Sequence, residues 1–168
     1  MAREEILKQA KEFFFKAMLV GWPAGVRGAD VHGMPGYKEK GAFMGGSGTD
    51  FRLLDRWCVS TCGSAGTIAI WFRDEPIWIM FYGGHYPKEV IPFLKLALME
   101  AYKKDEFLGG RGPRVYLAVN KELRYFNGVI PPSNFSRFEG REEIYVVNSD
   151  GTEAEMVGWH KYWGMALI

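Results

Sequence analysis

The segment 66–84, which reads GTIAIWFRDEPIWIMFYGG, constrains the fold more than any other part of the chain. Two runs rich in Ile, Trp and Phe flank the polar residues 73–76, and this pattern is typical of a β-hairpin. Neither run alternates apolar with polar residues, which predicts that both faces of the hairpin are covered. We therefore expect these two strands to lie at the centre of a sheet.

Two further segments have the periodicity of amphipathic helices. Residues 2–20 place apolar side chains at helical spacing, with charged residues on the remaining surface. Residues 88–104 do the same, and Pro87 suits the start of that helix. Because the balanced charges of the N-terminal helix are those of a solvated surface, we expect this helix to cover one face of the sheet.

The rest of the chain supplies more strands. Additional β-prone runs occur near 51–58, 115–119 and 123–126, and a last hairpin is indicated around the turn residues 148–151. Strands that follow one another through short turns form antiparallel sheets. The sequence therefore predicts an α+β fold with an antiparallel sheet of about five to seven strands and two packed helices.

The domain organisation is simple. The length of 168 residues and the absence of a linker predict a single domain over residues 1–168, and no internal repeat is evident. Residues 21–50 contain nine glycines and two prolines, and we expect an irregular loop there. The sequence GGSGT at 45–49 lacks the preceding strand and the Gly-Lys-Ser/Thr ending of a phosphate loop, so we expect no phosphate binding by it.

Composition excludes several classes of function. A net charge of +1 with interspersed charges argues against nucleic acid as the main partner. No apolar run is long enough for a membrane span, and the first residues have no signal-peptide core, so we expect a cytoplasmic protein. Cys58 and Cys62 do not make a disulfide framework, which fits a reducing compartment.

Five pieces of the sequence occur in an order that resembles a known family. They are RDEPIWIMFYGG at 73–84, FLKLAL at 93–98, RGPRVY at 111–116, FEGREEI at 138–144 and WHKYWG at 159–164. Over roughly residues 50–165 the chain resembles the uncharacterised domain-of-unknown-function family 5680. Members of that family occur alone or at the C-terminus of helix-turn-helix regulators, and the resemblance implies a shared fold and site without an established activity.

The chain also departs from the pattern of that family. Its members have Arg-Asp before an aromatic residue in the first strand, where this chain has Asp55-Arg56-Trp57, and a Glu where this chain has Ile68. No helix-turn-helix is evident in the N-terminal part, so DNA binding by relatives does not carry over.

The abundance of aromatic residues predicts a ligand pocket. Arg111 lies in a Gly-Arg-Gly-Pro sequence between a helix and a strand, where it could present its guanidinium to a carboxylate or phosphate. Glu142 is a further carboxylate that could converge on it. In the alternative, the aromatic residues form the core and Arg111 pairs with a carboxylate that ties helix to sheet. The predicted ligand-binding residues are Arg111, Asp55, Trp57, Trp78, Tyr82, Tyr116, Glu143 and His160.

Three functions remain open from the sequence. The first is binding or sensing of a small, anionic or partly apolar molecule without catalysis, closed off by the loop 21–50. The second is a hydrolase or isomerase that uses a carboxylate such as Asp55 or Glu143 with His160 as acid and base, and the third is an oligomerisation or partner-binding module. A homodimer is compatible with all three, and we expect no cofactor and no metal, because the histidines and cysteines lack the spacing of a zinc site.

Overall fold

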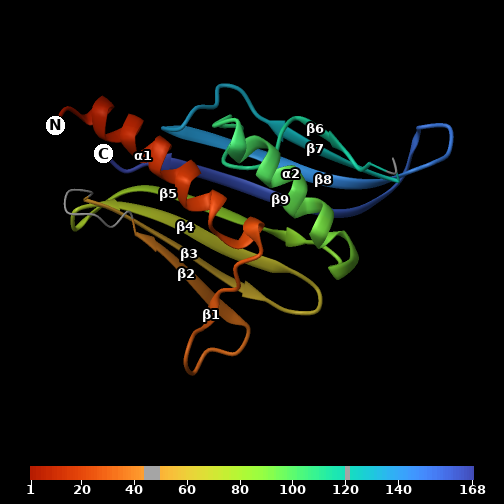
Figure 1. Cartoon of the computed structure of the whole chain (residues 1–168), viewed down its shortest axis with the longest axis horizontal. Coiled ribbons are helices and arrows are strands. Elements are labelled where there is room, and N and C mark those ends of the chain that lie inside the picture. The colour runs from red at the N-terminus through yellow and green to blue at the C-terminus, as the bar shows by residue number, and fades with distance from the viewer. Residues whose placement is uncertain (44–49, 120–121) are drawn as a thin grey trace.

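The computed structural model describes residues 1–43, 50–119 and 122–168. The helical elements are α1 (Arg3–Leu19), η1 (Trp22–Ala24), η2 (Lys88–Val90) and α2 (Ile91–Lys103). The strands are β1 (Ala29–Asp30), β2 (Tyr37–Phe43), β3 (Phe51–Val59), β4 (Ser64–Phe72), β5 (Glu75–His85), β6 (Val115–Leu117), β7 (Leu123–Val129), β8 (Arg137–Val147) and β9 (Glu153–Ala166). The predicted α+β class and both predicted helices are confirmed (Figure 1).

The strands form one antiparallel sheet in the order β1-β2-β3-β4-β5-β9-β8-β7-β6. The described residues contain nine strands, so the expectation of five to seven was too low. The additional strands β1 and β2 lie in the glycine-rich segment 21–50, which we expected to be irregular. The GGSGT sequence at 45–49 lies outside the described residues.

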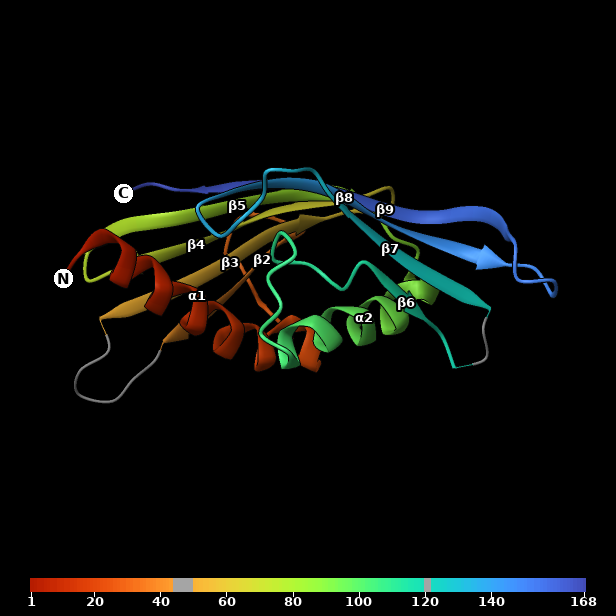
Figure 2. The ribbon, with the colours of Figure 1, turned by 90° about the horizontal axis from the view of Figure 1, so that it is seen from above.

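Both helices pack on the same face of the sheet (Figure 2). The hairpin of β4 and β5 is central, as expected, but only one of its faces is covered by helices. On the other face Trp71, Ile79 and Phe81 are only half-buried, and Trp163 on the neighbouring β9 is 49% exposed. The prediction that both faces are covered was therefore wrong, because apolar residues on the outer face shield one another without a second layer.

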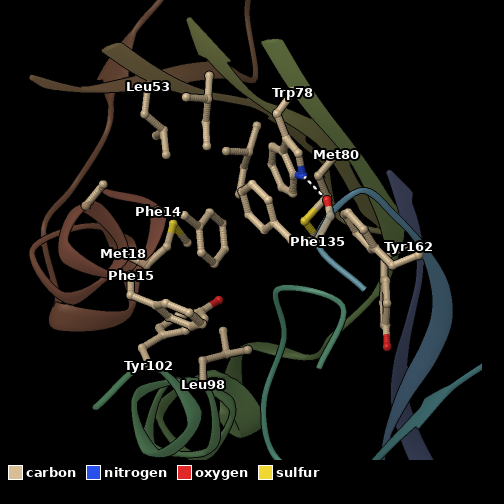
Figure 3. Close-up of a cluster of buried hydrophobic side chains, with 14 of the residues drawn as sticks. Phe14, Phe15, Met18, Leu53, Trp78, Met80, Leu98, Tyr102, Phe135 and Tyr162 are labelled. Carbon is tan, nitrogen blue, oxygen red and sulfur yellow. Dashed lines mark hydrogen bonds between the residues drawn. The ribbon is translucent and has the colours of Figure 1, made fainter. Parts of the chain in front are cut away.

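Aromatic side chains fill the space between the helices and the sheet (Figure 3). Phe14 of α1 lies at the centre of this core, with its ring 5.5 Å from that of Trp78. Trp78 stacks on Phe135 at 5.0 Å, and its Nε1 donates a hydrogen bond of 2.7 Å to the Phe135 carbonyl oxygen. None of the helices formed by the described residues is long and apolar enough to cross a membrane.

The chain contains an internal repeat that the sequence does not reveal. α1 is followed by β2–β5, and α2 is followed by β6–β9. We call these two units the first and second unit. They lie side by side in one sheet, where the last strand of the first unit, β5, pairs with the last strand of the second unit, β9. Tyr82 of β5 and Tyr162 of β9 are directly paired there, so an approximate two-fold axis passes between them.

The two units agree in detail around this axis. Gly66 of β4 is paired with Tyr82, and Gly140 of β8 is paired with Tyr162. Neither glycine has room for a Cβ atom, because the tyrosine hydroxyl of its own unit lies over it. Equivalent positions in the two units can therefore be compared directly, residue by residue.

Candidate functional site

A polar network lies on the helix-covered face, within the otherwise apolar core. Arg111, in the segment after α2, donates a charge-assisted hydrogen bond to Glu142 of β8, and both side chains are buried. Tyr125 of β7 donates a second hydrogen bond of 2.6 Å to Glu142. Burial alone would raise the pKa of Glu142, but the charge and hydrogen bond of Arg111 outweigh burial and hold this pKa below its usual value. Arg111 thus ties the helix layer to the sheet.

The network continues across the centre of the sheet to Asp55 of β3. The Tyr82 hydroxyl donates a 2.8 Å hydrogen bond to Asp55 Oδ1, and the guanidinium carbon of Arg111 lies 5.6 Å from the centre of the Tyr82 ring. Burial raises the pKa of Asp55 to about 6, although the Tyr82 hydrogen bond and the charge of Arg111 act in the opposite direction. In the second unit, the equivalent tyrosine, Tyr162, donates to Asn127 in place of an aspartate.

His160 of β9 lies between a hydroxyl and a carboxylate. Its Nε2 is 3.1 Å from Ser64 Oγ, and its Nδ1 is 3.6 Å from Glu142 Oε1. Burial and, to a smaller extent, the charge of Arg111 lower the pKa of His160 to about 4, so the imidazole is neutral near pH 7. The order of hydroxyl, imidazole and carboxylate is the one that activates a serine nucleophile in hydrolases.

The network is enclosed by protein. Asp55, Arg111, Glu142 and His160 are each at most 8% exposed, and Ser64 is half-buried. Tyr86 Oη, Arg111 Nε and His160 Nδ1 have no hydrogen-bond partner among the described residues. Since the surrounding aromatic side chains pack against one another, the interior shields the four buried side chains from solvent, and Ser64 is a more exposed member of the network.

A groove of about 1050 Å³ lies on the uncovered face of the sheet. It crosses the approximate two-fold axis, because both units contribute to it. Its floor contains Phe81 of β5 and Trp163 of β9, which are directly paired and stack with 4.5 Å between their ring centres. The lining residues are Met34, Tyr37, Arg56, Cys58, Ala65, Gly66, Thr67, Phe81, Tyr82, Gly83, Ile130, Glu139, Gly140, Arg141, Lys161, Tyr162 and Trp163.

The groove lining carries three cationic side chains and one carboxylate, Glu139. Arg56 forms an ion pair with Glu39 at 2.8 Å, and Arg141 forms an ion pair with Glu143 at 2.6 Å. Lys161 makes no ion pair with any residue that the structure describes. The groove therefore combines a flat apolar floor with two charged side chains of opposite sign, Lys161 and Glu139, that make no ion pair within 4.0 Å among the described residues.

The structure brings four of the predicted ligand-binding residues together in the buried network, namely Asp55, Tyr82, Arg111 and His160. Tyr82 is also one of the residues that line the groove.

The other four predicted residues lie elsewhere. Trp78 is in the core, and Tyr116 packs with its ring 5.7 Å from that of Phe93. Trp57 packs so closely against Gly28 that a Cβ atom there would clash with its ring. Glu143 lies on the uncovered face, where it binds Arg141 and accepts a hydrogen bond from Tyr145.

Strand alternation explains why Glu142 and not Glu143 joins the network. Glu142 is paired with His160, and it shares its face of β8 with the buried Phe138 and Ile144. Because Glu142 lies two residues before the apolar Ile144, the alternation of β8 predicts that Glu142 points to the helix-covered face. Ser64 and Lys161 carry no comparable signal, because each gains its role only from strands that are distant in the sequence.

The described residues contain no group of three or more His, Cys, Asp or Glu side chains that could hold a metal ion. Cys58 and Cys62 are free thiols, the first half-buried in the groove lining and the second exposed.

Comparison with protein families finds no family model that matches the chain. Searches of curated proteins and of solved structures find no match either. The resemblance to the domain-of-unknown-function family 5680 therefore stays a prediction, and function has to be inferred from the site itself.

Proposed function

We propose that this protein binds a small molecule with a flat, apolar part in the groove of the uncovered sheet face. The observation that carries this proposal is the stacked pair Phe81 and Trp163 on the floor of a groove of about 1050 Å³. Ligand sites of this kind combine aromatic surface with a few polar groups that fix orientation. The predicted function of ligand binding is kept, and we assign it to this groove and not to the buried network that four of the predicted residues form.

The size of the groove fits a small ligand. Pockets for small molecules enclose about 300–1,000 Å³, and the groove volume of about 1050 Å³ lies just above this range. The floor is held rigidly, because Phe81 and Trp163 lie on the two central strands and β4 and β8 flank them. A rigid aromatic floor reduces the loss of conformational entropy when a flat ligand binds.

The neutral dye N-phenyl-1-naphthylamine tests this proposal, because its fluorescence increases in an apolar site. We expect saturable binding to the native protein, and we expect Trp163→Ala to raise the dissociation constant about 10-fold through loss of the stacking surface. Trp71→Ala is the matched control, since Trp71 is a half-buried Trp on the same face outside the groove lining. Equal effects of the two substitutions, or no saturable binding, would contradict the proposal.

The alkylation rate of the Cys58 thiol is an independent measure of whether a ligand occupies the groove. In a Cys62→Ser background, the dye should slow alkylation of Cys58 by iodoacetamide, as followed by intact-protein mass. In a Cys58→Ser background, alkylation of the exposed Cys62 should keep its rate, because Cys62 is not part of the lining.

A second candidate function is favoured by the contacts of His160. Ser64 Oγ, His160 and Glu142 lie in the order needed for acyl transfer, in which the hydroxyl oxygen attacks an ester carbonyl and Nε2 accepts the hydroxyl proton. The alcohol would leave with that proton, and water would then release the acid from Ser64. This candidate is the acid and base enzyme expected from His160, with Glu142 in the place of Asp55 or Glu143.

An alkyl fluorophosphonate tests the second candidate, because an activated serine displaces its fluoride and gains the phosphonyl mass. If Ser64 is activated, peptide mapping should locate the added mass on Ser64, and His160→Gln should slow labelling at least 100-fold. Thr67→Val is the control, since it changes a hydroxyl of β4 on the opposite face. Labelling that is absent, or equally fast in His160→Gln, would exclude the enzyme.

A further inference from the structure

The two units differ at one pair of equivalent positions in the groove. In the first unit Thr67 of β4 is paired with Phe81 of β5. In the second unit the equivalent pair is Arg141 of β8 and Lys161 of β9. The same place in the same fold thus holds an uncharged pair on one side of the approximate axis and two cations on the other.

Two cations directly opposite each other on neighbouring strands destabilise a sheet. The charge of Arg141 is balanced by Glu143, and its guanidinium carbon lies 5.2 Å from the centre of the Trp159 ring. Lys161 has no carboxylate within 4.0 Å among the described residues, and the one carboxylate of the groove lining, Glu139, is paired across the strands with Trp163 and not with Lys161. The first unit shows that the fold does not require cations at this place, and a role in recognition accounts for their presence.

We infer that the ligand of the groove carries an anionic group, a carboxylate, phosphate or sulfonate, that binds between Lys161 and Arg141. This inference rests on the proposed function, in which the flat part of the ligand lies on Phe81 and Trp163. Lys161 and Trp163 are two residues apart on the same face of β9, a separation of about 7 Å along the strand. The ligand is therefore an aromatic anion that binds in one orientation, with its charge over the second unit.

The distinguishing experiment compares two dyes that share their rings. 8-Anilinonaphthalene-1-sulfonate carries a sulfonate, and N-phenyl-1-naphthylamine lacks it. For Lys161→Gln we expect the dissociation constant of the sulfonate dye to rise about 10-fold, because one charge-assisted contact is lost, while that of the neutral dye changes less than twofold. Lys103→Gln, which removes an exposed charge at the end of α2, should change neither constant.

A thermal measurement provides a second readout that a purely structural lysine would not give. Because Lys161→Gln removes repulsion from Arg141, the melting temperature without dye should rise by about 1–3 °C. Addition of the sulfonate dye should then raise the melting temperature of the wild-type protein more than that of Lys161→Gln.

The outcomes distinguish the proposed ligand binding in the groove from the inferred recognition of an anionic group. If the neutral dye binds and Lys161→Gln leaves the affinity for the sulfonate dye unchanged, the anionic class is overturned and the groove remains a binding site. If Lys161→Gln weakens both dyes equally, the inference also fails, because the lysine does not recognise the sulfonate. If the wild-type protein binds neither dye, the proposed function itself is overturned.

Discussion

Asp55 and His160 are buried on the same face of the sheet, and burial moves their pKa values in opposite directions. The pKa of Asp55 rises from 3.8 to about 6, so the folded state binds this proton more tightly and its contribution to stability is lost as pH rises through 6. The pKa of His160 falls from 6.5 to about 4, so its contribution is present above pH 6.5 and is lost as pH falls. Between pH 4 and 6.5 the two contributions oppose each other.

Single substitutions should separate these contributions. Because one pKa unit corresponds to about 1.4 kcal/mol, each group changes the free energy of unfolding by about 3 kcal/mol across this range. Relative to wild type, we expect Asp55→Asn to lose stability as pH falls from 6.5 to 4. In this variant the destabilisation caused by protonation of His160 is no longer offset by protonation of Asp55. His160→Gln should gain stability over the same range. Asn127, which accepts the Tyr162 hydrogen bond in the second unit, indicates that an amide fits at the position of Asp55.

Urea denaturation at several pH values between 4 and 7.5 measures these differences. His32→Gln is the control, since this imidazole is exposed, and it should follow the wild-type curve. If the free energy of unfolding varies with pH in the same way for wild type, Asp55→Asn and His160→Gln, the two groups do not make opposite contributions to stability.

The helices and the main strands could be predicted from the sequence, because their periodicity is local. The internal repeat could not, because the equivalent residues differ in chemistry and in spacing. Ile68 stands where the second unit has Glu142, because Ile68 is paired with Asp55 and Glu142 is paired with Asn127, both on the second strand of their own unit. The offset between equivalent residues grows from 72 for Asp55 and Asn127 to 80 for Tyr82 and Tyr162, because the turns differ in length.

The segments after the two helices place an arginine at equivalent positions with different surroundings. Arg27 follows the end of α1 by eight residues, and Arg111 follows the end of α2 by eight. Gly25 and Gly109 hold equivalent places with positive φ values of 90° and 66°, which favour glycine. Arg111 forms an ion pair with the buried Glu142, whereas the position equivalent to Glu142 in the first unit is Ile68, and Arg27 is exposed. From the sequence, Arg111 could bind a ligand or form an ion pair that ties helix to sheet, and the structure contains the ion pair.

For the whole molecule, the uncovered face could not be predicted from residue types. Strands with apolar residues on both sides indicate cover on both sides, yet here both helices lie on one face (Figure 2). The resulting molecule has two different surfaces on one sheet. The covered face holds a closed polar network, and the open face holds a groove at the junction of the two units. The expected homodimer stays a prediction.

The central claim is that ligands bind to the open face and leave the interior closed. The most direct test is a ¹H–¹⁵N correlation spectrum of the labelled protein, recorded during titration with 8-anilinonaphthalene-1-sulfonate. We expect the largest shift changes at the amides of Gly83, Gly140, Lys161 and Trp163, with little change at Arg111 and Gly112. Changes centred on Arg111, or spread evenly over both layers, would contradict the claim that the groove is the binding site.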